Sequence, residues 1–228
     1  MARTESRTLI SMLETITPSP VISSATARTW LLFAGIPATL ALYLLAWAYP
    51  TFPGDEAALI RFQALRTGWL DDTAVGFANL GVFWVFLPAA GVLIVFLFLT
   101  RRYADIGLVF GGFMVVGLGY GMKLLIDRPR PDYQIIEPFA SGLSFPSGHS
   151  LLAVILGGLL VYLLDQWMRS VLPRRAIQAG LILVVAGMGA SRVYLGVHWP
   201  SDVIGSYLLG VLALVGLVWL RNNILTAS

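Results

Sequence analysis

The chain has 228 residues, of which 57% are hydrophobic and only 12% are charged, and its net charge is +3 at pH 7. A soluble domain carries about 25% charged residues, so the composition excludes a water-soluble fold and predicts a protein that lies in the lipid bilayer. The basic residues punctuate apolar runs and form no single patch, which argues against nucleic acid as a partner. The absence of cysteine excludes disulfides and thiolate metal sites.

The first 27 residues are mostly polar and lack an early apolar core, so we expect no cleavable signal peptide. We predict an N-terminal tail over residues 1–27 and a single membrane domain over residues 28–228. A spanning helix needs about 20 apolar residues. Segments of this kind lie near residues 29–49, 75–100, 104–126, 148–168, 176–196 and 201–220. The sequence therefore predicts an all-α fold, a bundle of six transmembrane helices.

Two connectors are longer than the others, at about 50–74 and 127–147. In the first of them, the apolar positions of residues 57–66 fit a short helix that lies on the outer membrane surface. Tryptophan is enriched at membrane interfaces. The tryptophans that we expect on the outer face are Trp47, Trp69 and Trp199.

The third predicted span is rich in glycine. Small residues four positions apart let helices pack closely in lipid. The glycines in question are Gly107, Gly111, Gly117 and Gly121. We interpret them as packing positions.

The distribution of basic residues predicts the orientation of the chain. With a cytoplasmic N-terminus, the inner side holds Arg3, Arg7, Arg28, Arg101, Arg102, Arg169, Arg174, Arg175 and Arg221. The outer side then holds Arg61, Arg66, Lys123, Arg128, Arg130 and Arg192. The last four belong to a polar cluster with its own explanation, and the remaining bias supports cytoplasmic termini.

Ionisable residues beside membrane spans are functional candidates by default. Here they gather in three clusters, at residues 123–131, 146–149 and 191–202. No span separates the first cluster from the second, and two spans separate the second from the third. An even number of crossings puts all three clusters on one side of the membrane, which the charge distribution makes the outer side. The only two histidines of the chain, His149 and His198, fall in these clusters.

A metal site and an anion site are alternative interpretations of this polar face. Two histidines and Asp202 could ligate zinc. However, Lys123, Arg130 and Arg192 would surround that ion with positive charge, which repels a cation and attracts an anion. Arginine binds phosphate through two parallel hydrogen bonds and lysine adds a point charge. We therefore favour a phosphoryl group as the ligand.

The start of the fourth span adds a second anion-binding feature. Ser147 is placed to cap the helix, and Gly148 allows the backbone to approach a ligand closely. Free N–H groups at a helix N-terminus bind anions. With the three cations, this helix start is sufficient to hold a phosphoryl group and to stabilise its transition state.

The histidines supply the chemistry. His198 and Asp202 are four residues apart beside Pro200, which fits the first turn of the sixth span. A carboxylate that accepts from one ring nitrogen leaves the other nitrogen able to attack, so His198 is the candidate nucleophile. His149 is then the candidate acid that protonates the leaving group and later activates water. Taken alone, His198 and Asp202 are also compatible with a helix-capping pair.

These residues resemble the signature of the type 2 phosphatidic acid phosphatase superfamily. Its three parts are Lys-x6-Arg-Pro, Pro-Ser-Gly-His and Ser-Arg-x5-His-x3-Asp. The matching residues are Lys123, Arg130, Pro131, Pro146, Ser147, Gly148, His149, Ser191, Arg192, His198 and Asp202. The motifs cover residues 123–202, and the six-span layout extends the resemblance over nearly the whole chain.

The resemblance implies a reaction without metal or cofactor, in which His198 is the nucleophile, His149 the acid and Asp202 the group that orients His198. It implies a phosphate site formed by Lys123, Arg130, Ser147, Gly148 and Arg192. It further implies a lipid phosphatase of the bacterial inner membrane that acts at the periplasmic or outer face. The expected substrate is phosphatidylglycerophosphate, phosphatidic acid or undecaprenyl diphosphate.

Three other functions remain open on the sequence alone. A lipid phosphotransferase would use the same phosphohistidine with a different acceptor. A vanadate-dependent haloperoxidase shares the pocket, although the six-span architecture argues against it. A transporter or non-catalytic membrane scaffold is disfavoured by the intact set of nucleophile, acid and carboxylate.

Overall fold

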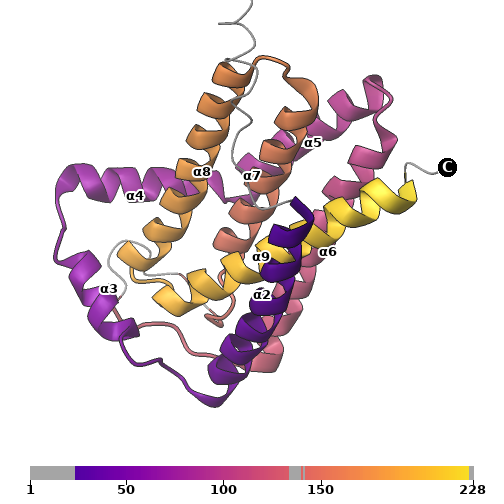
Figure 1. Ribbon diagram of the computed structural model, residues 1–228. Helices are drawn as coiled ribbons and strands as arrows, with labels where there is room; N and C mark the ends of the chain where they lie inside the picture. Colours follow the sequence, from indigo (N-terminus) through magenta and orange to yellow (C-terminus); the bar gives the residue numbers. More distant parts are fainter. Residues whose placement is uncertain (1–23, 134–139, 141, 226–228) are drawn as a thin grey trace, which may run out of the picture.

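The computed structural model describes residues 24–133, 140 and 142–225, and every regular element in this part is a helix (Figure 1). The helices are α2 (Ser24–Ala48), α3 (Asp55–Gln63), α4 (Gly68–Leu80), α5 (Phe83–Leu99), α6 (Tyr103–Ile126), α7 (Gly148–Trp167), α8 (Val171–Tyr194), α9 (Pro200–Leu220) and a π-helical turn, η1 (Arg221–Leu225). The predicted all-α fold is confirmed. The expected tail at residues 1–27 overlaps the start of α2, and residues 1–23 lie outside the described part.

Five helices, α2, α6, α7, α8 and α9, are each long and apolar enough to cross a membrane. Helices α4 and α5 pass the same test as a pair, which is bent by 50° at a short break. The chain therefore has up to six spans, in agreement with the sequence.

The second span differs from the expected straight helix over residues 75–100. It begins earlier, at Gly68, and the helix is interrupted at Gly81 and Val82. Glycine is a weak helix former. The backbone of Val82 is extended (φ −75°, ψ 141°), so α5 begins at an angle of 50° to α4. Residues 75–99 contain no charged residue on either side of the break, so this apolar run alone does not reveal the bend.

The short helix expected at residues 57–66 is present as α3, two residues earlier at its start. Asp55 and Glu56 occupy its first turn, where carboxylates interact favourably with the helix dipole. Gly54 precedes them with a φ of 93°, a conformation that glycine adopts at no steric cost. The connector therefore turns sharply before α3 and directs the Asp55 side chain into the protein.

Helix α7 is the centre of the bundle and packs against α6, α8 and α9 (Figure 1). One face of it carries Leu151, Ile155, Leu159 and Leu163, each at most 1% exposed and each four residues from the next. This spacing puts the four side chains in one row along the helix. The burial of α7 places its first turn inside the molecule, where the second polar cluster lies.

The glycines of α6 pack as expected only in part. A side chain at Gly111 would collide with Leu217 of α9. In contrast, a Cβ atom at Gly117 or Gly121 would meet nothing within 4 Å, so the packing role assigned to these two is wrong. The close contacts with α7 are made instead by Gly112, against Ile155, and by Gly119, against Leu151.

The tryptophans also separate into two kinds. Trp47 and Trp69 are about two-thirds exposed, as expected for side chains at the membrane surface. Trp199 is only 5% exposed, and its indole Nε1 donates a hydrogen bond to the carbonyl of Pro129 at 3.1 Å. Its expected interfacial placement is wrong, because it forms part of the scaffold beneath the polar clusters.

Candidate active site

The three polar clusters meet at one cavity of about 320 Å³. It lies where α6 and α8 end and where α7 and α9 begin. Its lining residues are Tyr120, Lys123, Arg130, Ala140, Gly142, Leu143, Gly148, His149, Arg192 and His198. A larger groove of about 370 Å³ lies at the far ends of α7 and α9, but no histidine or charged side chain lines it.

Helix ends position the lining side chains. Lys123 lies in the last turn of α6, and Arg192 lies in the last turn of α8. Gly148 and His149 open α7, so the cavity receives the N-terminus of a buried helix. The cations and the helix start therefore face the same space, an arrangement that attracts anions.

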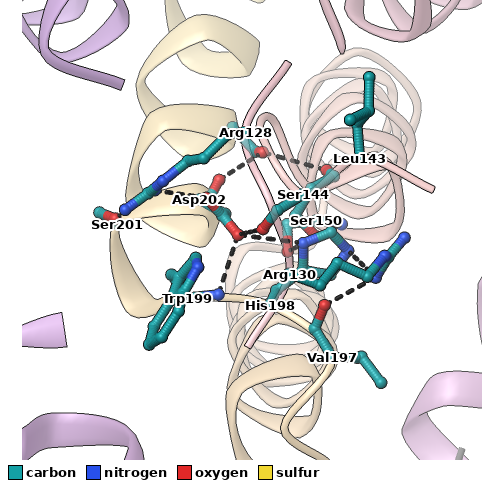
Figure 2. Close-up of polar contacts among 12 residues, drawn as sticks. Arg128, Arg130, Leu143, Ser144, Ser150, Val197, His198, Trp199, Ser201 and Asp202 are labelled. Atoms are coloured by element: carbon teal, nitrogen blue, oxygen red, sulfur yellow. Dashed lines mark hydrogen bonds and ion pairs between the residues drawn. The ribbon is translucent and has the colours of Figure 1, made fainter. Parts of the chain in front are cut away.

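His198 is oriented by Asp202, as Figure 2 shows. Its Nδ1 lies 3.2 Å from Oδ2 of Asp202, and its side chain is buried, with the residue 2% exposed. A proton held on Nδ1 by this carboxylate leaves Nε2 without one. Nε2 lies on the cavity side, 3.4 Å from Nη1 of Arg130. The ring thus presents an unprotonated nitrogen to the cavity.

Asp202 is held by several donors at once. Its Oδ2 accepts from the backbone N–H of Trp199 at 2.8 Å and from the hydroxyl of Ser144. Its Oδ1 accepts from Nη1 of Arg128 at 2.6 Å. Because every one of these partners is a donor, the contacts favour the carboxylate form and fix its position behind His198.

Backbone carbonyls hold two of the cations in place. The Nζ of Lys123 donates to the carbonyls of Leu143 at 2.9 Å and Ser144 at 3.2 Å. Arg130 donates from Nε to Gly142 at 3.1 Å and from Nη1 to Val197 at 2.6 Å. These contacts restrict both side chains to the cavity wall and lower the entropy lost when an anion binds.

Burial lowers the pKa of His198 well below its usual value near 6.5. The positive charges of Lys123, Arg130 and Arg192 lower it further, because they disfavour a second cation. At neutral pH the imidazole is therefore uncharged, which is the form that a nucleophile requires.

The structure brings together the predicted site residues with one exception. His149, His198, Lys123, Arg130, Gly148 and Arg192 line the cavity, and Asp202 stands directly behind His198. Ser147 does not line it. Its hydroxyl caps α7 by accepting from the N–H of Ser150 at 3.5 Å, and its own N–H points to the carbonyl of Asp202 at 3.4 Å. The direct phosphate contact expected of Ser147 is therefore not supported by its position.

Three residues of this region have no role predicted from the sequence. Tyr120 lines the cavity one turn before Lys123. Arg128 and Asp55 form a buried ion pair behind Asp202. Arg128 belongs to the first polar cluster, so its place in the sequence could have indicated a role. Asp55 lies in a distant connector, and no feature of the sequence indicates a role for it.

The donor set of the cavity does not suit a metal ion. Among residues 24–133, 140 and 142–225, no group of three or more His, Asp or Glu side chains is arranged to hold one. The cavity wall instead carries three cations, and the neighbouring carboxylate of Asp202 is engaged by four donors. This chemistry fits an anionic ligand.

Family and sequence comparisons with known proteins point to the same family. A family model described as the PAP2 superfamily matches residues 104–225. A phosphatidylglycerophosphatase B from Bacillus subtilis is 34% identical over 69% of this chain and 78% of its own length. An undecaprenyl-diphosphatase from Sulfolobus acidocaldarius is 31% identical over 67% of this chain and 70% of its own. A decaprenylphosphoryl-5-phosphoribose phosphatase from Mycobacterium tuberculosis is 30% identical over 69% and 85%.

Solved structures agree with these matches. The crystal structure of a transmembrane PAP2-type phosphatidylglycerolphosphate phosphatase from Bacillus subtilis superposes with a TM-score of 0.71. The two chains are 25% identical, and the alignment covers 84% of this chain and 98% of the other. The crystal structure of Aquifex aeolicus LpxE gives a TM-score of 0.58 over 74% of this chain.

Proposed function

The chain belongs to the PAP2 superfamily, and from this membership and the geometry of its cavity we propose that it is an integral-membrane lipid phosphatase. The substrate is a phosphomonoester or diphosphate of a membrane lipid, and the reaction passes through a phosphohistidine. The observation that carries the proposal is the pairing of His198 with Asp202 inside a cavity that also contains His149 and three cations.

In the first step, Nε2 of His198 attacks the phosphorus atom. Lys123, Arg130, Arg192 and the N-terminus of α7 stabilise the charge on the phosphoryl oxygens. The bond between phosphorus and the leaving oxygen breaks, and His149 donates a proton to that oxygen. The products of this step are the lipid alcohol, or the lipid monophosphate from a diphosphate, and a phosphorylated His198.

In the second step, water enters on the side that the leaving group vacated. His149, now neutral, accepts a proton from the water as its oxygen attacks phosphorus. The phosphorus–nitrogen bond breaks and its electron pair returns to Nε2 of His198. Inorganic phosphate leaves, and both histidines regain their starting forms.

The names of the relatives support a lipid-linked substrate. Each describes a phosphatase of a lipid or prenyl phosphate: phosphatidylglycerophosphate, undecaprenyl diphosphate or decaprenylphosphoryl-5-phosphoribose. We infer that the lipid tails stay in the membrane while the phosphate enters the cavity. Following the charge distribution, we place the cavity at the outer face of a bacterial inner membrane and the termini in the cytoplasm.

The test is phosphate release from a panel of lipids, containing phosphatidic acid, phosphatidylglycerophosphate and undecaprenyl diphosphate, in detergent with a chelator present. We expect release without added metal, and loss of at least about 10³-fold in the His198→Ala variant while its thermal unfolding stays cooperative. Equal activity of His198→Ala and the unchanged protein would overturn the proposal, as would a strict requirement for a divalent cation.

A phosphotransferase is the second candidate, because the same phosphohistidine could pass its phosphate to an alcohol. Phosphate release in the absence of an added acceptor separates the two. Trapping of a phosphohistidine that persists until an acceptor is added would favour the transferase.

A further inference from the structure

An ionic cluster lies behind the candidate nucleophile, on the side away from the cavity. It consists of Asp55, Arg128 and Asp202, which are 5%, 1% and 0% exposed. Arg128 joins the two carboxylates: its Nη2 donates to Asp55 at 2.8 Å, and its Nη1 donates to Asp202 at 2.6 Å. Figure 2 shows Arg128 reaching Asp202 from the side opposite His198.

The guanidinium of Arg128 is held in one orientation by contacts on every side. Its Nε donates to the carbonyl of Pro50 at 3.0 Å, and Nη1 also donates to the hydroxyl of Ser201 at 2.8 Å. The ring of Phe52 lies under it, with the guanidinium carbon 4.5 Å from the ring centroid. A guanidinium fixed in this way fixes the carboxylate it contacts.

Asp55 is surrounded by donors. Its Oδ1 accepts from the N–H of Ser201 at 3.0 Å, and its Oδ2 accepts from the hydroxyl of Ser201 at 2.6 Å and the N–H of Phe52 at 3.2 Å. With Arg128 these make four donors. These contacts bind the first residue of α3 to the first turn of α9.

The net charge of the cluster matters for the reaction. Asp202 and Arg128 alone would cancel, and the pair would offer little stabilisation to a charged ring. With Asp55 the cluster carries one net negative charge. When Nε2 of His198 bonds to phosphorus while Nδ1 keeps its proton, the ring becomes positively charged, and a buried negative cluster beside it stabilises that charge.

We propose that Asp55 and Arg128 are positioning residues for the phosphohistidine step: Arg128 fixes Asp202 against His198, and Asp55 supplies the net negative charge that offsets the charge on the phosphorylated ring. This inference rests on the proposed function. It assigns to the short helix α3 a part in the reaction, through its first residue.

A purely structural role is the competing explanation, since breaking a buried ion pair is destabilising in any part of a protein. The two explanations differ in what they change. A structural anchor affects the free energy of unfolding, whereas a positioning residue affects the rate of phosphorylation of His198. The test must therefore measure the phosphoenzyme and not stability alone.

The chain offers a matched control at the opposite end of the bundle. Asp105 is 1% exposed and pairs with Arg221 at 2.9 Å and Arg102 at 3.3 Å. It lies in the first turn of α6, whereas Lys123 lies in the last, which puts it about 27 Å along the helix from the cavity. Asp105→Asn removes a buried, ion-paired carboxylate just as Asp55→Asn does, although Asp105 pairs with two arginines and Asp55 with one.

The experiment compares Asp55→Asn, Arg128→Lys, Arg128→Ala and Asp105→Asn in the full chain in detergent micelles. The substrate is the member of the lipid panel with the highest turnover, and acid-quenched single turnovers measure the rate at which phosphohistidine forms. We expect this rate, and kcat, to fall roughly tenfold in Asp55→Asn and 10²-fold in Arg128→Ala, with KM changed by no more than about twofold. Asp105→Asn should lower the melting temperature and leave the phosphorylation rate unchanged.

Arg128→Lys and chemical rescue test whether the planar guanidinium of Arg128 is needed to fix Asp202. Lysine keeps the charge but cannot contact two carboxylates in one plane, so this variant should remain impaired. Millimolar guanidinium should restore part of the phosphorylation rate to Arg128→Ala and should leave the rate of Asp105→Asn unchanged. If the Arg128 variants do not fold, Asp55→Asn decides the question alone.

The outcomes distinguish this inference from the proposed function. An unchanged phosphorylation rate in folded Asp55→Asn would refute the role of the cluster even where His198→Ala is inactive. A fall of equal size in Asp105→Asn would mean that lost stability, and not positioning, explains the effect. Activity in His198→Ala would instead reject the phosphohistidine itself.

Discussion

His198 is the residue whose protonation state decides whether the proposed attack can begin. Its burial and the nearby charges of Lys123, Arg130 and Arg192 lower its pKa well below 6.5. The unfolded chain, in contrast, titrates at the ordinary value. The neutral form therefore persists in the folded protein as the pH falls below 6.5, and acidification below that value destabilises the fold.

We predict that the His198 ring remains neutral at pH 6 with its proton on Nδ1. Because the chain has only two histidines, NMR of protein labelled with nitrogen-15 in histidine can follow each ring, and His149→Ala assigns the signals. The same titration in Arg130→Ala should move the pKa of His198 upward, since one of the charges that lower it is gone. A midpoint near 6.5 in the unchanged protein would contradict the prediction.

The motif residues were accessible from the sequence because their spacing encodes their geometry. His198 and Asp202 are four residues apart across the start of α9, so a contact between their side chains could be expected from the sequence. Asp55 and Arg128 were not accessible in this way. They are 73 residues apart in the chain, and they meet because Arg128, just after α6, and Asp55 of α3 both contact the first turn of α9. A pairing between distant segments leaves no periodic or local signal.

The break between α4 and α5 places backbone directly against a predicted catalytic side chain. A Cβ atom at Gly81 would lie 2.3 Å from Cδ2 of His149, whereas ordinary contacts begin near 3.4 Å. The imidazole would have to move by about 1 Å, and a displacement of that size costs roughly 10²-fold in rate. The bend is thus coupled to the position of the proposed acid.

We predict that Gly81→Ala lowers kcat by roughly 10²-fold while the fold is retained. Gly76→Ala in α4 and Gly91→Ala in α5 are the controls, since a Cβ atom at either position meets nothing within 4 Å. Alanine favours a helix over glycine by about 0.5–1 kcal/mol, so both controls should be as stable as the unchanged protein or more so. Phosphate release and thermal unfolding check the series, and full activity of Gly81→Ala would show that His149 is not constrained by the bend.

The elements were predictable to different degrees for a physical reason. Long apolar runs predicted α6, α7 and α9 to within one residue at each end, because the bilayer dictates their length, whereas α8 begins five residues before its expected start at residue 176. The bend at Gly81 was not predictable, because residues 75–99 contain no charged residue on either side of it. The tertiary role of Trp199 was missed for a related reason: hydropathy marks it as interfacial, and only its hydrogen bond to Pro129 shows it to be internal.

The bundle as a whole brings the three polar motif clusters to one end. The α7 helix has 20 residues and a length of about 30 Å, which matches the hydrocarbon core of a bilayer. An even number of spans separates the three polar clusters, so they share one face, and the structure brings them to one cavity. The distribution of arginine residues predicts the side of the membrane to which this face belongs, and this prediction is open to direct measurement.

We predict that the cavity end faces the cell exterior, and single cysteines can test this. The chain has no cysteine of its own. Thr67 and Ser170 form a matched pair, because each is an exposed helix N-cap whose side chain makes no capping hydrogen bond. Thr67 precedes α4 at the cavity end, where neighbouring Gln63 donates to the carbonyl of Tyr133, whereas Ser170 lies beyond the far end of α7.

A membrane-impermeant maleimide applied to intact cells should label Thr67→Cys and spare Ser170→Cys until the cells are lysed. Neither substitution changes a charged residue, so the arginine bias that orients the chain is preserved in both variants. Retained phosphatase activity in each variant serves as the control for folding. The reverse labelling pattern would place the cavity in the cytoplasm and would require a substrate presented by the inner leaflet.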